Sequence, residues 1–116
     1  MAKYEATLHA GFDSLLRTIH EEVLQGSMSA SYEDGSDLLL ANGCRCAHRV
    51  YERYSVIGGN RVSLSVMLAE QENGTYVSAI TSGGNRAIWK INTFGENTFG
   101  EQSFLDQFID ILHKIQ

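Results

Sequence analysis

The chain has 116 residues, of which 43% are hydrophobic and 20% are charged, and its formal net charge at pH 7 is −5. This length and balance are typical of one globular domain spanning residues 1–116, and they exclude a disordered tail or a fibrous protein. The acidic charge argues against non-specific binding to nucleic acid or to an anionic membrane. No apolar run approaches the ~20 residues that span a bilayer, and the chain starts without a signal-peptide core, so we expect a cytoplasmic protein.

The first elements are a strand and a helix. Residues 3–9 alternate apolar and polar side chains, which predicts a strand that Gly11 ends. Apolar residues then recur at helical spacing over residues 12–23, and Gly26 follows where a C-terminal cap belongs, so we predict an amphipathic helix of about three turns. We expect His20 to be a solvated surface residue, because no second metal ligand lies one turn away.

Two turn signals follow the helix. Residues 27–33 alternate again, and Asp34-Gly35 predicts a turn before the apolar run at residues 38–41. Asn42-Gly43 is the strongest short hairpin signal in the chain and predicts a tight turn.

Cys44 and Cys46 are the only cysteines, and they share one face of the next predicted strand with His48. Successive residues on that face lie ~6.6 Å apart, which is too far for the three side chains to hold one metal ion. We therefore expect buried thiols and no metal site.

A hairpin register is predicted from Gly58-Gly59-Asn60, which is typical of a three-residue loop between two alternating runs. This loop would pair Ile57 with Arg61. The side chains then predicted to face the helices are Val62, Leu64, Val66, Leu68, Val56, Tyr54, Glu52, Val50 and His48. The side chains predicted on the opposite, solvated face are Arg45, Ala47, Arg49, Tyr51, Arg53, Ser63, Ser65 and Met67.

Two consequences of this register concern charge. Glu52 would lie among apolar neighbours, where a carboxylate must be paired, hydrogen-bonded or raised in pKa. Arg45, Arg49 and Arg53 would form a basic row, which is either a solvated sheet face or a set of pairs with nearby carboxylates.

The last part of the sheet is predicted from residues 75–81, which alternate as a further strand. Gly83-Gly84 indicates a hairpin that would pair Thr81 with Arg86 and bring a final strand against this one.

Residues 92–101 read Asn-Thr-Phe-Gly-Glu twice, which we interpret as a local duplication within a linker because two such short units cannot form a solenoid. Apolar residues over 104–115 then make a wide helical stripe. They predict a second amphipathic helix with Ser103 as its N-cap.

The order of elements predicts an α+β fold, with an antiparallel sheet of about six or seven strands and two helices packed on one face. This order is similar to the helix-grip architecture of small-ligand carriers and polyketide cyclases. That similarity implies a curved sheet around the C-terminal helix and a cavity between them.

Four segments also resemble a known family: residues 50–54, 58–64, 79–84 and 91–96. The family is an uncharacterised group of short proteins from Gram-positive bacteria, known as a domain of unknown function. The resemblance covers nearly the whole chain and implies a stand-alone domain. It transfers no activity, cofactor or site residue.

Two functions compete on these grounds. The first is a small-ligand binding module with a pocket between the sheet and the C-terminal helix, and its candidate residues are Glu52, His48, Tyr54, Tyr76 and Trp89. The second is a homodimer or protein-interaction module without a ligand, and its candidate interface residues are Arg49, Tyr51, Arg53 and Met67. The sequence lacks a nucleophile-elbow glycine pattern, paired metal ligands and a phosphate-binding loop, so it favours binding over catalysis and we expect no cofactor.

Overall fold

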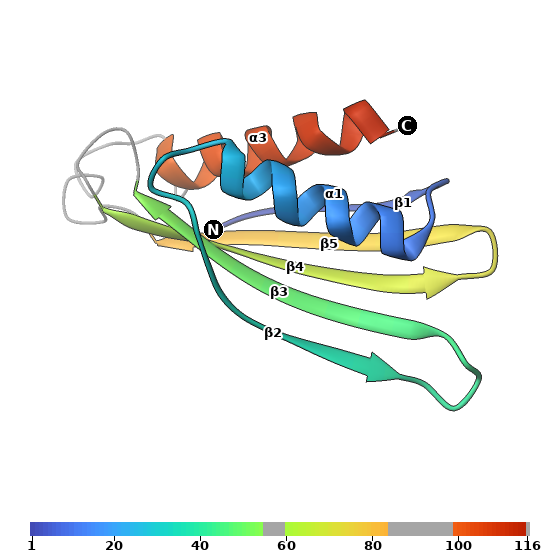
Figure 1. Ribbon diagram of the computed structural model, residues 1–116. Coiled ribbons are helices and arrows are strands. Elements are labelled where there is room, and N and C mark those ends of the chain that lie inside the picture. The colour runs from blue at the N-terminus through green and yellow to red at the C-terminus, as the bar shows by residue number, and fades with distance from the viewer. Residues whose placement is uncertain (55–59, 84–98, 116) are drawn as a thin grey trace.

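A computed structural model describes residues 1–54, 60–83 and 99–115. Within these ranges the fold is α+β, with five antiparallel strands and two helices (Figure 1). The elements in chain order are β1 (Ala2–Leu8), α1 (Phe12–Gln25), β2 (Ser31–Leu39), β3 (Arg45–Tyr54), β4 (Arg61–Gln71), β5 (Gly74–Gly83) and α3 (Phe99–Ile115). Neither helix in the described part of the chain is long and apolar enough to cross a membrane.

The strands form one sheet in the order β1-β5-β4-β3-β2. Thr81 of β5 pairs with Ala2 of β1 on one side and with Leu64 of β4 on the other. Because β1 pairs with β5 at this position, the predicted pairing of Thr81 with Arg86 is wrong. Within the described ranges the sheet has five strands, where six or seven were predicted. Residues 84–98, which include the expected final strand, lie outside the described residues.

The α1 helix confirms the prediction from helical periodicity. Its apolar stripe is buried, and it ends at Gln25. Gly26 follows as the C-cap, and its backbone N–H donates to the Glu22 carbonyl at 3.0 Å. The α3 helix begins at Phe99, earlier than expected, so Ser103 lies inside the helix and is not its N-cap. The second copy of the repeated five residues thus ends within α3.

Both helices lie on the same face of the sheet (Figure 1), and α1 also packs against α3. Phe104, Phe108 and Leu112 of α3 are buried and fill the space between that helix and the strands β5, β4 and β1. The predicted pocket beside the C-terminal helix is therefore occupied by core side chains.

The two turn predictions have different outcomes. Asn42-Gly43 does form the tight turn, with Gly43 at φ +88° and its N–H donating to the Leu40 carbonyl at 2.9 Å. Asp34-Gly35 does not form a turn, because β2 continues through it and absorbs one extra residue as a bulge between Tyr32 and Asp34.

The register of β3 against β4 differs from the prediction. Tyr54, and not Ile57, pairs with Arg61, which moves β3 by three residues (54 in place of 57). An odd shift transfers every side chain of a strand to the other face. Ile57 and the expected three-residue loop lie outside the described residues, and the ladder itself ends at the Tyr54–Arg61 pair.

This shift leaves half of the facing prediction correct. Val62, Leu64, Val66 and Leu68 are fully buried beneath the helices, as expected. The prediction for β3 is wrong, because the side chains that join them on the helix-facing side are Arg45, Ala47, Arg49, Tyr51 and Arg53. The β3 side chains on the opposite face are Cys46, His48, Val50, Glu52 and Tyr54.

Burial on β4 can be tested with a matched pair of leucines. Leu64 is 0% exposed, whereas Leu39 at the end of β2 is 69% exposed. Leu64→Ala should lower the free energy of unfolding by ~2–5 kcal/mol, and Leu39→Ala should change it by about 0.5 kcal/mol at most. Urea denaturation of both variants measures the difference, and equal effects would contradict the assigned faces.

Candidate functional site

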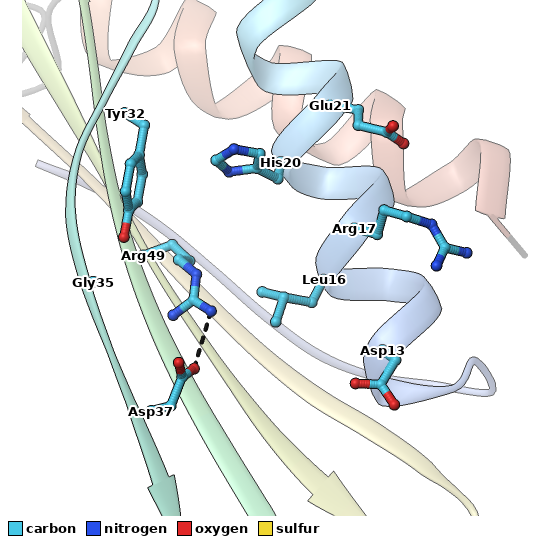
Figure 2. Close-up of a pocket in the computed structure, with 9 residues that line it drawn as sticks. All are labelled: Asp13, Leu16, Arg17, His20, Glu21, Tyr32, Gly35, Asp37 and Arg49. Atoms are coloured by element: carbon cyan, nitrogen blue, oxygen red, sulfur yellow. Dashed lines mark hydrogen bonds and ion pairs between the residues drawn. The ribbon is translucent and has the colours of Figure 1, made fainter.

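The candidate site is an open cleft of about 520 Å³ between α1 and the strands β2 and β3. These two strands extend beyond the part of the sheet that the helices cover (Figure 1). From α1, Leu16 and His20 point toward the sheet, while Arg17 and Glu21 point away from it (Figure 2). The α1 side chains that face the sheet across the cleft are thus Leu16 and His20, while the other α1 residues that line it, Asp13, Arg17 and Glu21, are charged.

Three rings pack together at the inner end of the cleft, and two of them, His20 and Tyr32, line it. Tyr51 of β3 is the cross-strand neighbour of Tyr32 on β2, and their ring centroids lie 5.7 Å apart. His20 reaches down from α1 and meets Tyr32 edge to face, with 5.3 Å between the centroids. Tyr51 is fully buried and Tyr32 is 43% exposed, so the group of rings runs from the core to solvent.

A hydrogen bond joins the helix to the sheet within this group of rings. The His20 Nδ1 atom lies 2.9 Å from the Tyr51 hydroxyl, and His20 is half-buried. The prediction of a solvated His20 is therefore wrong. Because the buried hydroxyl needs an acceptor for its own hydrogen, we assign Tyr51 as donor and Nδ1 as acceptor, which leaves the proton of neutral His20 on Nε2.

Arg49 supplies the positive charge of the cleft. Its guanidinium donates to the carbonyls of His48 at 2.9 Å and Ser36 at 3.1 Å, and to the Asp37 carboxylate at 3.0 Å. The Arg49 side chain is only 16% exposed, whereas the Asp37 side chain is 72% exposed. The protein thus fixes the orientation of Arg49 through backbone carbonyls and leaves its carboxylate partner in solvent. Figure 2 shows the contact between Arg49 and Asp37.

Gly35 makes room for this arrangement. A Cβ atom at this position would lie 2.6 Å from the Tyr32 hydroxyl oxygen and 2.9 Å from Cδ of Arg49. Such contacts are closer than packed atoms tolerate, so a larger residue would displace the side chains of the cleft. The glycine therefore serves close packing and not the turn that we predicted.

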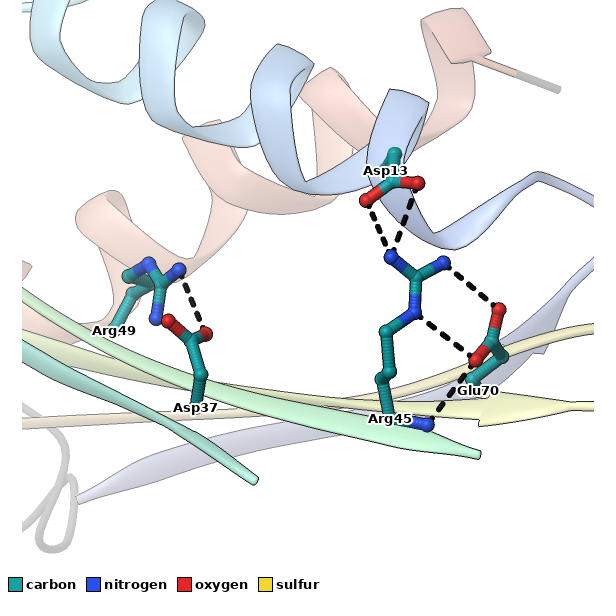
Figure 3. A network of polar contacts seen from close by, with 5 residues as sticks. All are labelled: Asp13, Asp37, Arg45, Arg49 and Glu70. Atoms are coloured by element: carbon teal, nitrogen blue, oxygen red, sulfur yellow. Dashed lines mark hydrogen bonds and ion pairs between the residues drawn. The ribbon is translucent and has the colours of Figure 1, made fainter. Parts of the chain in front are cut away.

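Arg45 lies on the same face of β3 as Arg49 and contacts Asp13 in the first turn of α1 (Figure 3). It donates to Glu70 through Nε at 3.2 Å and a terminal nitrogen at 3.0 Å, and to Asp13 at 2.9 Å. Its guanidinium also stacks 4.6 Å from the Phe12 ring centroid. The hydrogen bond from Arg45 lowers the pKa of Glu70, which stays ionised at neutral pH.

Arg53 occupies the opposite end of the row, beneath α3. It is 9% exposed, donates to Gln107 Oε1 and to Ser103 Oγ, the latter at 3.1 Å, and lies 4.4 Å from the Phe104 ring centroid. Burial lowers its pKa. Of the two interpretations of the arginine row, carboxylate pairing thus holds for Arg45 and Arg49, and Arg53 uses neutral partners.

The structure moves the predicted ligand-binding residues away from the helices. His48 and Tyr54 are exposed on the other face of the sheet, and Glu52 lies there in an ion pair with Arg61. Tyr76 is on that face too, and its hydroxyl donates to Glu5 at 2.7 Å. These four side chains cannot line a pocket beneath the helices. Trp89 lies outside the described residues.

The predicted interface residues are divided between the two faces. Only Met67 lies on the uncovered face, where it is 42% exposed. Arg49, Tyr51 and Arg53 belong to the helix side because of the odd register shift, so they do not form one surface with Met67.

Cys44 and Cys46 are half-buried free thiols. In the part of the chain that the structure describes, no group of three His, Cys, Asp or Glu side chains is arranged to hold a metal ion.

A family model matches the chain over residues 1–116, and its description is a family of unknown function, DUF6054. The chain belongs to the DUF6054 family. A search of curated proteins found no match. Because the family description carries no activity, the function of this DUF6054 protein has to be argued from the cleft itself.

The sequence reasoning missed the main cleft residues, namely His20, Tyr32, Gly35, Asp37 and Arg49. One signal was present, because arginines at positions 45, 49 and 53 repeat with an even spacing and must share a strand face. The sequence pattern nevertheless predicts a solvated face, since buried arginines are costly when unpaired. Their partners on α1, α3 and β2 are not visible in a local pattern.

The ionisation of Tyr51 gives a test of its burial. Desolvation raises the pKa of Tyr51 to about 12 from an ordinary value of 10.0. A folded-state pKa above the unfolded value stabilises the protein below pH 10 and loses that contribution as the pH rises toward 12. The melting temperature should therefore fall more steeply between pH 10 and pH 12 for the natural protein than for Tyr51→Phe. Parallel slopes would contradict a buried Tyr51.

The Arg45–Glu70 pair gives a test at acidic pH. Because the pKa of Glu70 lies below its ordinary value of 4.5, the pair stabilises the fold above that pH and is lost as the pH falls through the folded-state value. Glu70→Gln should flatten the acidic limb of a plot of melting temperature against pH. Glu72→Gln, which changes an exposed residue of the adjacent turn, is the control and should retain the natural slope.

Proposed function

We propose that this protein binds a small carboxylate with an aromatic or short aliphatic body in the cleft between α1 and the strands β2 and β3. The observation that carries the proposal is the set of hydrogen bonds made by Arg49. Its guanidinium is held by two backbone carbonyls within the cleft, and the carboxylate that it contacts among the described residues is that of the solvent-exposed Asp37. A ligand carboxylate can replace an exposed partner of this kind without leaving a buried charge unpaired.

The remaining surfaces suit the body of such a ligand. Leu16 from α1 and Tyr32 from β2 face the cleft from opposite sides, and His20 lies between them with Nε2–H as a donor. Ligand sites typically combine apolar walls with a few fixed polar groups in this way. The ring edges and the leucine methyl groups favour a planar or branched apolar body.

The charges around the cleft narrow the ligand class. The carboxylates that line it are those of Asp13, Glu21 and Asp37, with Arg17 beside them on α1, and Asp13 is already engaged by Arg45. These carboxylates disfavour polyanions such as nucleotides, because like charges in a partly desolvated site repel. A ligand with one negative charge fits Arg49 and avoids most of this repulsion.

The proposal is tested by calorimetric titration of the protein with benzoate, 3-phenylpropionate and hexanoate, using benzamide as the uncharged counterpart of benzoate. We expect binding of at least one carboxylate and none of benzamide. Arg49→Gln should weaken that binding by about tenfold or more, as expected for loss of a charge-assisted hydrogen bond. Arg61→Gln changes an arginine on the other face of the sheet and should leave the affinity unchanged.

Asp37 provides a second, opposite readout. If it only occupies Arg49 until a ligand arrives, Asp37→Asn should strengthen carboxylate binding because the competitor is weakened. Equal affinities for the natural protein and Arg49→Gln would contradict the assignment of Arg49. Failure of every carboxylate to bind at millimolar concentration would remove the proposed ligand class.

A further inference from the structure

A second surface lies on the opposite side of the sheet from the cleft. We call it the outer face, meaning the side chains of all five strands that point away from α1 and α3. No described element packs against it (Figure 1). Two rows of cross-strand neighbours on β3, β4 and β5 form its centre: His48, Met67 and Ser78, and beside them Val50, Ser65 and Ile80.

The outer face has an uncharged centre and a charged rim. Met67 is 42% exposed and Ile80 is 38% exposed, and both lie near the middle of the sheet. Charged side chains lie toward the margins instead, with Lys3 beside Glu5 on β1. At the end of the β3–β4 ladder, Arg61 pairs with Glu52 of β3 and with Glu33 at 3.4 Å. Depletion of charge at the centre with a polar rim is the composition of a protein–protein interface.

The arrangement of charged and apolar side chains on the outer face is complementary to a second copy of the same face. The central row continues outward to Asp34 on β2 at one edge and to Lys3 on β1 at the other, with Ser65 of β4 in the middle. A two-fold axis running along β4 in the plane of contact would therefore place Lys3 over the partner's Asp34. It would also place Val50 over the partner's Ile80, so that apolar meets apolar and opposite charges meet at both edges.

The size of the face is sufficient for a stable dimer. Five strands spaced ~4.8 Å apart, over about nine residues that each rise ~3.3 Å, give roughly 600–700 Å² for each copy. Two copies would bury roughly 1,200–1,400 Å², which is within the usual range of specific interfaces. Two sheets can pack face to face at a small angle in this way.

From this self-complementarity we infer that the outer face is the interface of a symmetric homodimer, with the two-fold axis along β4. The partner is a second copy of this chain, and the sheets of the two copies form the inner layers of a four-layer assembly. The cleft lies on the other side of each sheet and stays open to solvent, so this inference is independent of the proposed ligand.

Met67 gives the sharpest test because it lies on the central strand and near the middle of the face. A two-fold axis along β4 brings Met67 close to the partner's Met67, so Met67→Lys and Met67→Glu should each separate the dimer through like charges. An equimolar mixture of the two variants should dimerise again. Sedimentation velocity over a wide concentration range measures all three samples, and circular dichroism checks that each variant is folded.

Two controls keep the test specific. Met28→Lys changes a fully exposed methionine before β2, away from the outer face, and should leave the dimer intact. At the edges, Lys3→Asp and Asp34→Lys should each weaken the dimer by about tenfold, and the double variant should recover it.

Three results would overturn the inference. They are a natural protein that is monomeric at every concentration, a dimer that Met67→Lys leaves unchanged, and a mixture of the two Met67 variants that stays monomeric. The last result would mean that the face meets a different protein or a differently placed axis. Retention of benzoate binding by Met67→Lys would separate any failure here from failure of the proposed function.

Discussion

The pairing of β3 with β4 controls the organisation of this molecule. Because Tyr51 pairs with Leu64, its side chain enters the core, where the His20 ring accepts its hydrogen bond. The same pairing sends Glu52 to the outer face, where it meets Arg61. A slip of one residue would exchange these two sets and place a carboxylate under the helices in exchange for a tyrosine. Core packing and both candidate surfaces therefore depend on one register.

The cost of this register is a row of three arginines on the covered face of β3, and the structure offsets it by giving each a different environment. Arg45 lies beyond the start of α1 between two carboxylates, and Arg53 lies under α3 with neutral side chains and an aromatic ring. Arg49 lies between them, where the helices no longer cover the strands and backbone carbonyls take its hydrogen bonds. Buried guanidinium groups persist only when they are hydrogen-bonded, as Arg49 and Arg53 are, whereas the more exposed Arg45 is also in contact with solvent.

The two faces of the sheet differ because α1 and α3 cover only part of one face and none of the other. On one side, α1 and α3 pack against each other and against β4, β5 and β1, so β2 and β3 project past them (Figure 1). The overhang creates a cleft with a fixed cation and aromatic walls, which suits a small ligand. On the other side, the described helices leave the outer face of the five strands uncovered. The uncharged centre and charged rim of that face suit a second copy of the same sheet. The two surfaces share β3 but none of its side chains, because alternate residues face opposite ways.

The sequence by itself determined the α+β class, both helices, the Asn42-Gly43 turn and the helix-facing side of β4, because these depend on local periodicity and turn chemistry. It did not determine the facing of β3, since Arg45, Arg49 and Arg53 resemble a solvated surface until their partners are known. Those partners, such as Asp37, come from other elements that only the tertiary structure brings together. The return of β1 to the edge of β5 is likewise a long-range pairing, with no local signal in the residues that form it. Periodicity fixes which residues share a face, and the fold decides what that face meets.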